Sequence, residues 1–273
     1  MALVALWLQQ SQVRHMSKAI PLVYEEYGLA TNPAVIILHG FFASSRNWRS
    51  IARNLADDYH VYLLDMRNHG ESPHIQEMDY PSMAADIELF LDSQHLSKAN
   101  IVGHSMGGKV AMWLALTQPE RINKLIVVDI APVSYRHSFD NLIRALQQLP
   151  LEQLKNRKQA DSLLSSAIPE SSFRQFLLQN LALKEGKYVW RIDLDIFART
   201  ADNIIAFSDT EGLNAYQDKV LFLAGETSHY IDQDSVKTLF PEAEIKTIAK
   251  AGHWLHAEQP EAFCDIVNDF LIE

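Results

Sequence analysis

Short apolar runs alternate with amphipathic segments along most of this chain. The runs typical of strands buried in a sheet are residues 34–38, 59–64, 99–102, 125–128, 219–224 and 244–248, and residues 22–27 have the pattern of an edge strand. Segments with apolar residues at helical spacing lie at residues 48–55, 83–91, 108–116 and 260–271. Strands that alternate with helices are typical of a mostly parallel sheet with helices on both faces. The pattern therefore predicts an α/β fold.

The alternation stops between residues 133 and 207, where apolar positions recur at helical spacing without strand-like runs. A helical insertion into a single α/β domain explains this change. We therefore expect an α/β core formed by residues 16–132 and 208–273, a helical cap formed by residues 133–207, and an N-terminal extension at residues 1–15. Aromatic side chains in the cap region predict an apolar pocket, with Phe173, Phe176, Trp190 and Phe197 as its candidate lining.

Composition narrows the class of partner. The chain has 273 residues, of which 48% are hydrophobic and 21% are charged, which is enough for one large domain with its own core. Its formal net charge is −10, whereas binding to a phosphate backbone needs clustered Lys and Arg side chains. We therefore expect a neutral or weakly charged small-molecule substrate and no nucleic-acid partner.

The N-terminal segment and the single cysteine bear on the compartment. Residues 1–8 are apolar but too few to span a bilayer, and no clear leader-peptide cleavage site follows them. Cys264 lies within an apolar pattern, so we expect it in the core and expect no intrachain disulfide. These features favour a cytoplasmic protein without a stable membrane anchor, and they leave its oligomeric state open.

The stretch Gly103-His104-Ser105-Met106-Gly107 places a serine between a predicted strand and a predicted helix. A turn sharp enough to raise Ser105 above the sheet brings backbone atoms close together, so the flanking glycines avoid steric clashes. The turn also leaves the amide of Met106 at a helix N-terminus, where an unpaired N–H group can bind a negatively charged oxygen. The motif predicts that Ser105 is a nucleophile.

A serine hydroxyl needs a general base to act as a nucleophile at neutral pH. His253 lies between the last predicted strand and the last predicted helix, and we interpret it as that base. His104 is adjacent to Ser105, but neighbouring side chains at a sharp turn diverge, which makes His104 a poor base. The alternative for His253 is a structural role at the start of the terminal helix.

Two backbone N–H groups are expected to form an oxyanion hole. Met106 supplies one, and the loop that begins at His39 and Gly40, directly after a buried strand, supplies the other. We assign this second donor to the amide of Phe41, which contributes only its backbone, while Gly40 permits a close approach. This chemistry needs neither a metal ion nor a cofactor.

The acidic partner of His253 has two candidate positions. One follows the strand at residues 219–224, but Gly225-Glu226-Thr227-Ser228 has a serine where an aspartate is expected, which leaves Glu226 as the local candidate. The other is Asp129, which follows a buried run and is costly to bury unless a partner such as a histidine satisfies it. Both keep the order serine, acid, histidine. We favour Asp129, and a purely structural role for it as a loop anchor stays open.

Three motifs, in order, carry a resemblance to a known family. Asp-x-Arg-Asn-His-Gly-x-Ser-Pro-His at residues 65–74, Gly-His-Ser-Met-Gly-Gly-Lys at 103–109 and Val-Asp-Ile-Ala-Pro-Val at 128–133 resemble those of the α/β-hydrolase superfamily. Within it, they are most similar to the branch of small bacterial esterases, which also holds a related mitochondrial α/β-hydrolase-domain protein. The resemblance implies the α/β-hydrolase fold, an acid similar to Asp129, and esterase activity on short acyl esters or on thioesters of coenzyme A. In the first motif we interpret Asp65 and Arg67 as structural residues that brace the loops around the site.

These residues together predict a serine carboxylic-ester hydrolase. It would act on short to medium acyl esters, or on acyl-CoA thioesters, through an acyl-enzyme at Ser105. A hydrolase of carbon–carbon bonds could use the same three side chains. A non-catalytic ligand-binding protein on the same scaffold is the alternative from a different functional class.

Overall fold

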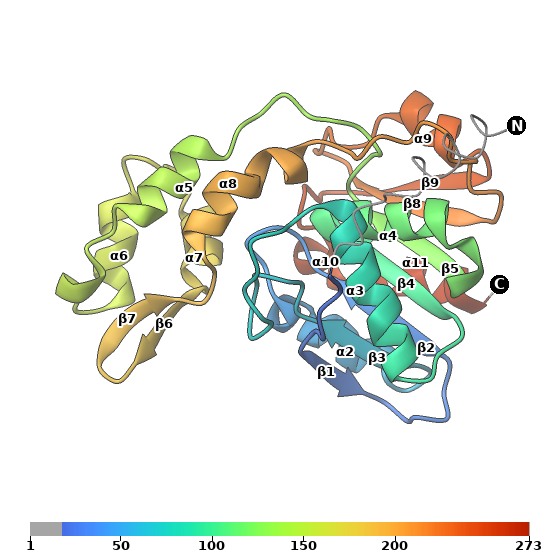
Figure 1. The fold of residues 1–273 in the computed structure, drawn as a ribbon, viewed down its shortest axis with the longest axis horizontal. Helices are drawn as coiled ribbons and strands as arrows, with labels where there is room; N and C mark the ends of the chain where they lie inside the picture. The colour runs from blue at the N-terminus through green and yellow to red at the C-terminus, as the bar shows by residue number, and fades with distance from the viewer. Residues whose placement is uncertain (1–17, 273) are drawn as a thin grey trace, which may run out of the picture.

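A seven-stranded sheet forms the centre of the computed structural model, which describes residues 18–272 (Figure 1). Its strands are β1 (Tyr24–Tyr27), β2 (Ala34–Leu38), β3 (His60–Leu64), β4 (Ala99–His104), β5 (Ile122–Val128), β8 (Val220–Gly225) and β9 (Ala243–Ile248). They lie in the order β1-β3-β2-β4-β5-β8-β9. Strand β1 pairs antiparallel with β3, and the other neighbours in this sheet are parallel. The prediction of a mostly parallel sheet is confirmed.

Each face of the sheet has its own hydrophobic core. Ile36 and Leu38 of β2 contribute to one core, and Val35 and Ile37 of the same strand contribute to the other. This division follows from the strand geometry, because successive side chains point to opposite faces. Both faces are covered by helices, so the inner strands carry apolar residues on both faces, which explains the continuous apolar runs in the sequence.

Helices lie on both faces of the sheet. The core around Val35 and Ile37 contains α2 (Arg49–Leu55), α10 (Leu255–Glu258) and α11 (Pro260–Ile272), and the core around Ile36 and Leu38 contains α3 (Tyr80–Ser93), α4 (Met106–Thr117) and α9 (Gln233–Leu239). Two short 3-10 helices, η1 (Ser45–Trp48) and η2 (Pro119–Arg121), lie in the connections. Cys264 of α11 is buried in the core around Val35 and Ile37, as expected from its apolar neighbours.

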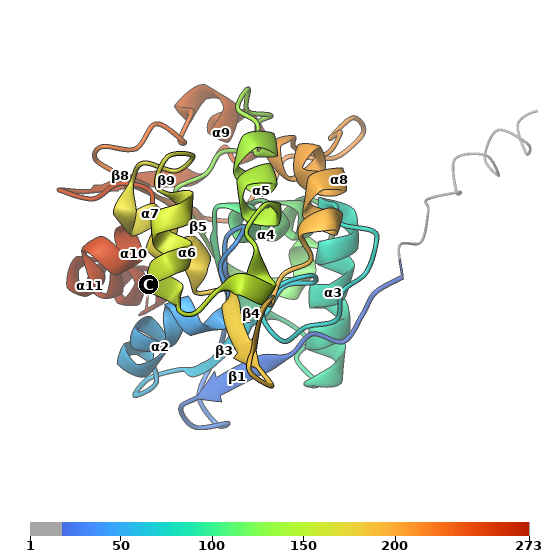
Figure 2. The same cartoon turned by 90° about the vertical axis from the view of Figure 1, so that its left-hand side faces the viewer.

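A second group of elements lies between β5 and β8, to the left of the sheet in Figure 1 and in front of it in Figure 2. It consists of α5 (Asp140–Gln147), η3 (Leu151–Gln153), α6 (Arg157–Leu164), α7 (Ser171–Leu178), β6 (Leu181–Lys184), β7 (Lys187–Trp190) and α8 (Leu194–Ile205). We call this group the cap. The core and cap boundaries proposed from the sequence stay predictions.

The hairpin of β6 and β7 within the cap was not expected from the helical spacing of its sequence. The two strands are joined by Glu185 and Gly186, both of which have positive φ values, 49° and 79°. A two-residue turn with positive φ at both positions matches the right-handed twist of paired strands. The Glu-Gly pair between two short segments was therefore a sequence indication of a hairpin turn. Each flanking segment is too short to show the alternating pattern of a strand.

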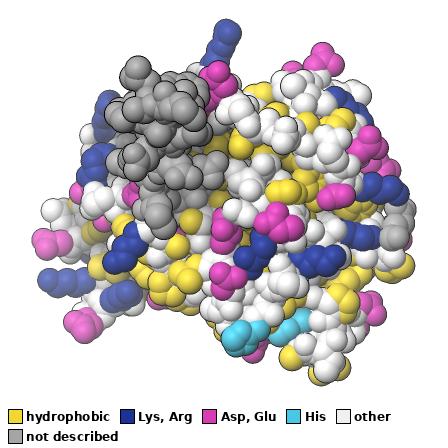
Figure 3. Space-filling view, turned by 45° about the vertical axis from the view of Figure 1, so that its right-hand side comes forward, with side chains coloured by type: hydrophobic (Ala, Val, Ile, Leu, Met, Phe, Trp, Pro, Cys, Tyr) yellow, Lys and Arg dark blue, Asp and Glu magenta, His cyan; other side chains and the backbone are white. Residues whose placement is uncertain are grey.

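The face of the molecule shown in Figure 3 is mixed in charge. Acidic and basic side chains are interspersed on the face shown in Figure 3, around patches of hydrophobic side chains. Within residues 18–272, no helix is both long enough and apolar enough to cross a membrane. The predicted extension at residues 1–15 lies outside the described residues.

Candidate active site

Ser105 lies on a strained turn between β4 and α4. Its φ is 52° and its ψ is −117°, a combination that residues other than glycine rarely adopt. A Cβ atom at Gly103 would overlap the carbonyl oxygen of Gly107, and a Cβ atom at Gly107 would overlap that of Leu38. The turn therefore requires both glycines, and it places Ser105 at the carboxyl end of the central strand, directly before the α4 N-terminus.

The carboxylate of Asp129 lies beside the ring of His253. Its Oδ2 atom is 2.7 Å from Nδ1 of His253 and accepts a hydrogen bond from Oγ of Ser228 at 2.5 Å, while its Oδ1 atom accepts one from the amide of Gly225 at 3.1 Å. Asp129 is fully buried, and these donors satisfy a carboxylate that burial would otherwise make costly. Because Nδ1 of His253 donates to Asp129, Nε2 is the nitrogen left to accept a proton.

The two candidate positions for the acid converge in space. Ser228, which occupies the position where the sequence pattern expects an aspartate, donates to Asp129 instead. Glu226 is exposed, and its Oε2 atom accepts a hydrogen bond from the amide of Lys250 at 2.7 Å. Among the described residues, Asp129 and not Glu226 contacts His253. The role of Asp129 as the catalytic acid stays a prediction.

The loop that carries Phe41 forms a tight turn against Ser105. The amide of Ala43 donates to the carbonyl oxygen of Gly40 at 3.1 Å, and Phe42 has a φ of 61°. A Cβ atom at Gly40 would lie 3.0 Å from Nδ1 of His104 and 3.2 Å from Cβ of Ser105, so a larger residue would push these side chains away by a few tenths of an ångström. In the described part of the chain, the amides of Phe41 and Met106 have no protein acceptor, and both residues line the cavity at Ser105. These amides can therefore receive an oxyanion.

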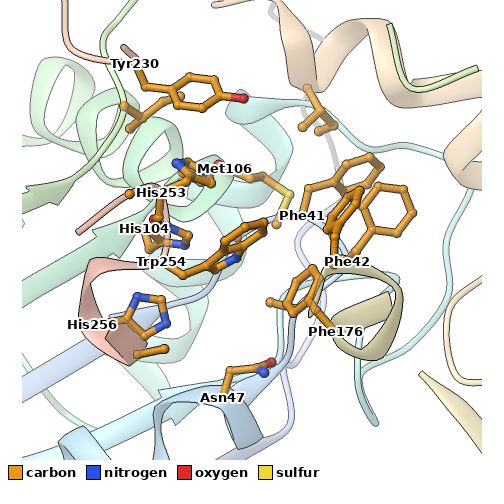
Figure 4. Close-up of a pocket in the computed structure, with 18 of the residues that line it drawn as sticks. Phe41, Phe42, Asn47, His104, Met106, Phe176, Tyr230, His253, Trp254 and His256 are labelled. Carbon is orange, nitrogen blue, oxygen red and sulfur yellow. Dashed lines mark hydrogen bonds between the residues drawn. The ribbon is translucent and has the colours of Figure 1, made fainter. Parts of the chain in front are cut away.

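Ser105 and His253 open into one cavity of about 860 Å³ (Figure 4). In Figure 4 the rings of His104, His253 and Trp254 lie on one side of the cavity, and those of Phe41, Phe42 and Phe176 lie on the other. The aromatic lining comes from both the core and the cap: Phe41, Phe42, Trp48, Tyr80, Tyr135, Phe139, Phe173, Phe176, Tyr230 and Trp254. The cavity that Ser105 lines is mostly apolar, as ligand sites usually are.

Two of the four cap residues predicted to line the pocket do so, and two do not. Phe173 and Phe176 line the cavity. Trp190 lies at the end of the hairpin beside a smaller surface pocket, and Phe197 is fully buried with its ring centroid 4.4 Å from that of Phe41. The prediction was wrong for these two because neither the hairpin nor the side of α8 that faces the core could be read from the spacing of aromatic residues.

His39 and His104 are engaged in other hydrogen bonds. Nδ1 of His39 donates to the carbonyl oxygen of Gly40 at 2.8 Å, and its Nε2 accepts from the amide of Met66 at 3.0 Å. Nε2 of His104 donates to the carbonyl oxygen of His253 at 2.8 Å. Burial lowers the pKa of both residues, and the proximity of His253 lowers that of His104 further, which favours the neutral form of each ring. The bond from His104 ties the loop of His253 to the turn of Ser105, a connection that the sequence did not indicate.

The motif at residues 65–74 supports these loops. Oδ1 of Asp65 accepts from the amide of Ser45 at 2.8 Å, and Oδ2 accepts from the amide of Glu71 at 2.9 Å. Arg67 forms a fully buried ion pair with Asp86, with 2.7 Å between Nε and Oδ2. Both residues connect segments far apart in the sequence, which agrees with the structural interpretation of this motif.

We expect acid to destabilise the protein partly through His256. Its ring stacks on Trp48 with centroids 3.9 Å apart, its Nδ1 has no partner among the described residues, and burial lowers its pKa from 6.5 to about 3. Below about pH 6.5 the unfolded chain therefore binds a proton at His256, whereas the folded chain binds this proton only below about pH 3. Between these values each pH unit costs roughly 1.4 kcal/mol of unfolding free energy for such a histidine.

Urea unfolding at pH 7.5, 6.0 and 5.0 tests this expectation on the wild type and on His256→Phe, which keeps an aromatic ring against Trp48. The unfolding free energy of His256→Phe should fall less steeply with decreasing pH. The matched control is His229→Phe at an exposed position, which should follow the wild type. Parallel pH profiles for wild type and His256→Phe would contradict the expectation.

The chain matches known proteins over nearly its whole length. The sequence profile of a family described as alpha/beta hydrolase fold matches residues 33–260. The sn-1-specific diacylglycerol lipase ABHD11 of Mus musculus is 39% identical over 268 residues, which cover 93% of this chain and 86% of that protein. Esterase YbfF of Escherichia coli K12 is 35% identical over 246 residues, which cover 88% of this chain and 93% of that protein. The solved structure of a marine microorganism esterase is 41% identical, with a TM-score of 0.88, and the match covers 92% of this chain and 100% of that one.

Proposed function

The chain belongs to the α/β-hydrolase family as a hydrolase of the esterase and lipase type, and on this premise we propose that it is a serine esterase with Ser105, His253 and Asp129 as its catalytic triad. The observation that carries the proposal is the 2.7 Å hydrogen bond between Nδ1 of His253 and Oδ2 of Asp129. It orients a histidine that lines the same cavity as Ser105 on its strained turn.

In the proposed mechanism, Oγ of Ser105 attacks the ester carbonyl carbon while Nε2 of His253 takes the hydroxyl proton. The carbonyl oxygen becomes an oxyanion, which the amides of Phe41 and Met106 stabilise. His253 returns the proton to the leaving alcohol as the tetrahedral intermediate collapses to an acyl-enzyme. A water molecule, deprotonated by His253, then attacks the acyl carbon, and the acid leaves as the Ser105 hydroxyl is restored.

The cavity supports an uncharged ester as substrate. Its volume of about 860 Å³ is typical of sites for a single small organic ligand, about 300–1,000 Å³. Its charged lining includes the carboxylates of Glu170 and Glu258. Among the described residues the only Lys or Arg in this lining is Lys109, whose Nζ already donates to the carbonyl oxygens of Ile205 and Ala206 at 2.8 and 2.7 Å. The mouse relative is named for diacylglycerol, an uncharged ester, which supports the same class.

The triad could also cleave thioesters of coenzyme A. The cavity, however, is lined by the carboxylates of Glu170 and Glu258, which repel the phosphate groups of coenzyme A. A phosphate-bearing substrate is usually recognised by free Arg or Lys side chains. We therefore propose short to medium acyl esters as the substrate class, with thioester hydrolysis restricted to neutral thioesters.

The test compares matched substrates. We expect turnover of p-nitrophenyl acetate, butyrate and octanoate and of dioctanoylglycerol. S-butyryl-N-acetylcysteamine, a neutral thioester, should have a kcat/KM at least about tenfold above that of butyryl-CoA, which corresponds to about 1.4 kcal/mol. Equal or faster hydrolysis of butyryl-CoA would contradict the proposed charge preference. Inactivity on all of these esters would contradict the esterase assignment itself.

A further inference from the structure

Asn180 of the cap reaches into the turn that carries Phe41. It lies between α7 and β6 and is only 4% exposed. Its Nδ2 donates to the carbonyl oxygen of Phe42 at 2.7 Å and to that of Leu177 at 3.2 Å. Its backbone carbonyl accepts a hydrogen bond from the amide of Arg191 at 2.8 Å. The position of this side-chain amide is therefore set by the cap, while its shorter hydrogen bond is to the core.

The residue that Asn180 holds has an unfavourable backbone conformation. Phe42 is the third residue of the turn closed by the Ala43 amide and the Gly40 carbonyl, and its φ is 61°. Glycine or asparagine is preferred where a turn needs a positive φ at this position. A phenylalanine left to itself favours negative φ, and that change would reorient the peptide groups next to Phe41. An external contact must therefore hold the turn in its present form.

The cap also packs against the side chains of the turn. The ring centroid of Phe42 lies 5.7 Å from that of Phe139 and 5.3 Å from that of Phe197, and the centroid of Phe41 lies 5.1 and 4.4 Å from the same two rings. Ring packing fixes where the turn lies, but it is not directional enough to fix how a peptide group is oriented. A hydrogen bond to the peptide carbonyl is directional, and Asn180 supplies it.

We propose that Asn180 is a positioning residue for the oxyanion hole. Its bond to the carbonyl oxygen of Phe42 keeps the turn in the conformation that presents the amide of Phe41 to the oxyanion. This inference rests on the proposed function, because it needs an oxyanion that forms during attack by Ser105. The cap then has a second role besides lining the cavity. A shift of the segment between α7 and β6 would move Asn180 and so change the position of the Phe41 amide.

Three variants test the proposal. Asn180→Leu removes the donor with little change in side-chain size, and Asn180→Asp keeps the shape but faces the Phe42 carbonyl with an acceptor. Arg199→Ala is the matched control, because it removes another bond between cap and core, from Nη2 of Arg199 to Oε1 of Gln76 at 2.6 Å, at an exposed position. Circular dichroism and thermal melting establish which variants are folded, and Asn180→Asp decides alone if Asn180→Leu does not fold.

Both Asn180 variants should lower kcat on p-nitrophenyl butyrate by about 10- to 100-fold while KM changes little. The inhibition constant of an alkyl trifluoromethyl ketone should rise by a similar factor, because its hemiketal oxygen needs the same amide donors. The affinity for a dialkyl ether of equal length, which forms no such oxygen, should stay unchanged. Arg199→Ala should match the wild type in all three measurements.

Two outcomes would overturn the role of Asn180. One is a folded Asn180 variant with the kcat of the wild type. The other is an equal loss of affinity for the ketone and the ether, since a general distortion of the cavity affects both ligands. Either result with an active wild-type protein leaves the proposed esterase function intact, whereas a wild type that hydrolyses no ester contradicts that function and this inference with it.

Discussion

Replacement of Asp129 by asparagine should lower kcat on p-nitrophenyl butyrate by roughly 10⁴-fold. Oδ2 of Asp129 accepts hydrogen bonds from both His253 and Ser228, and Oδ1 accepts one from the amide of Gly225. An asparagine can place its oxygen at only one of these positions, so its NH2 group must face a donor at the other. In one orientation, His253 loses the hydrogen bond that holds it in the tautomer able to accept the Ser105 proton. In the other orientation, the amide of Gly225 loses its acceptor.

The matched control is Glu226→Gln, which removes the charge of the other candidate acid. In the described part of the chain the side chain of Glu226 accepts a hydrogen bond only from the amide of Lys250, so activity should stay within about threefold of the wild type. Ser228→Ala removes one hydrogen-bond donor from Asp129, and its kcat should lie between those of Asp129→Asn and Glu226→Gln. Near-normal activity of a folded Asp129→Asn together with a collapse in Glu226→Gln would reverse the assignment of the acid.

Replacement of Ser105 by alanine should remove turnover of every ester, a loss of roughly 10⁶-fold, together with labelling by a fluorophosphonate. Ser105 lies on the strained turn directly before Met106 and lines the same cavity as His253 and Phe41, so its hydroxyl is the expected nucleophile. Alanine also tolerates the φ of 52° at this position poorly, so thermal melting should accompany the activity assay. Mass spectrometry of the labelled wild type should locate the phosphonate on Ser105.

The same measurement separates the alternative functions. A wild type that is labelled at Ser105 but hydrolyses no ester would favour a carbon–carbon bond hydrolase, which needs the same nucleophile. A wild type that is neither labelled nor active would favour a ligand-binding protein on this scaffold. Residual labelling of Ser105→Ala at the wild-type rate would show that another residue reacts and would contradict the role of Ser105.

The fold could be predicted because its signals are local. The apolar run at residues 34–38 coincides with β2, and the glycines at 103 and 107 indicate the sharp turn because only residues without a side chain fit there. The cap was harder to predict. Its hairpin has only four residues in each strand, and the direction of Trp190 and Phe197 depends on packing that no periodicity records.

By itself, the sequence determined the alternation of strands and helices, the turn around Ser105 and the short set of residues able to assist it, because each depends on sterics between near neighbours in the chain. Only the tertiary structure decided which acid lies beside His253. Strands β5 and β8 are neighbours in the sheet, so Asp129 and Ser228, 99 residues apart in the chain, come within hydrogen-bonding distance. The contact of Asn180 with Phe42 spans 138 residues and depends on how the cap packs on the core. Contacts of this kind follow from the order of the strands and the packing of the cap, and these are set by the whole chain together.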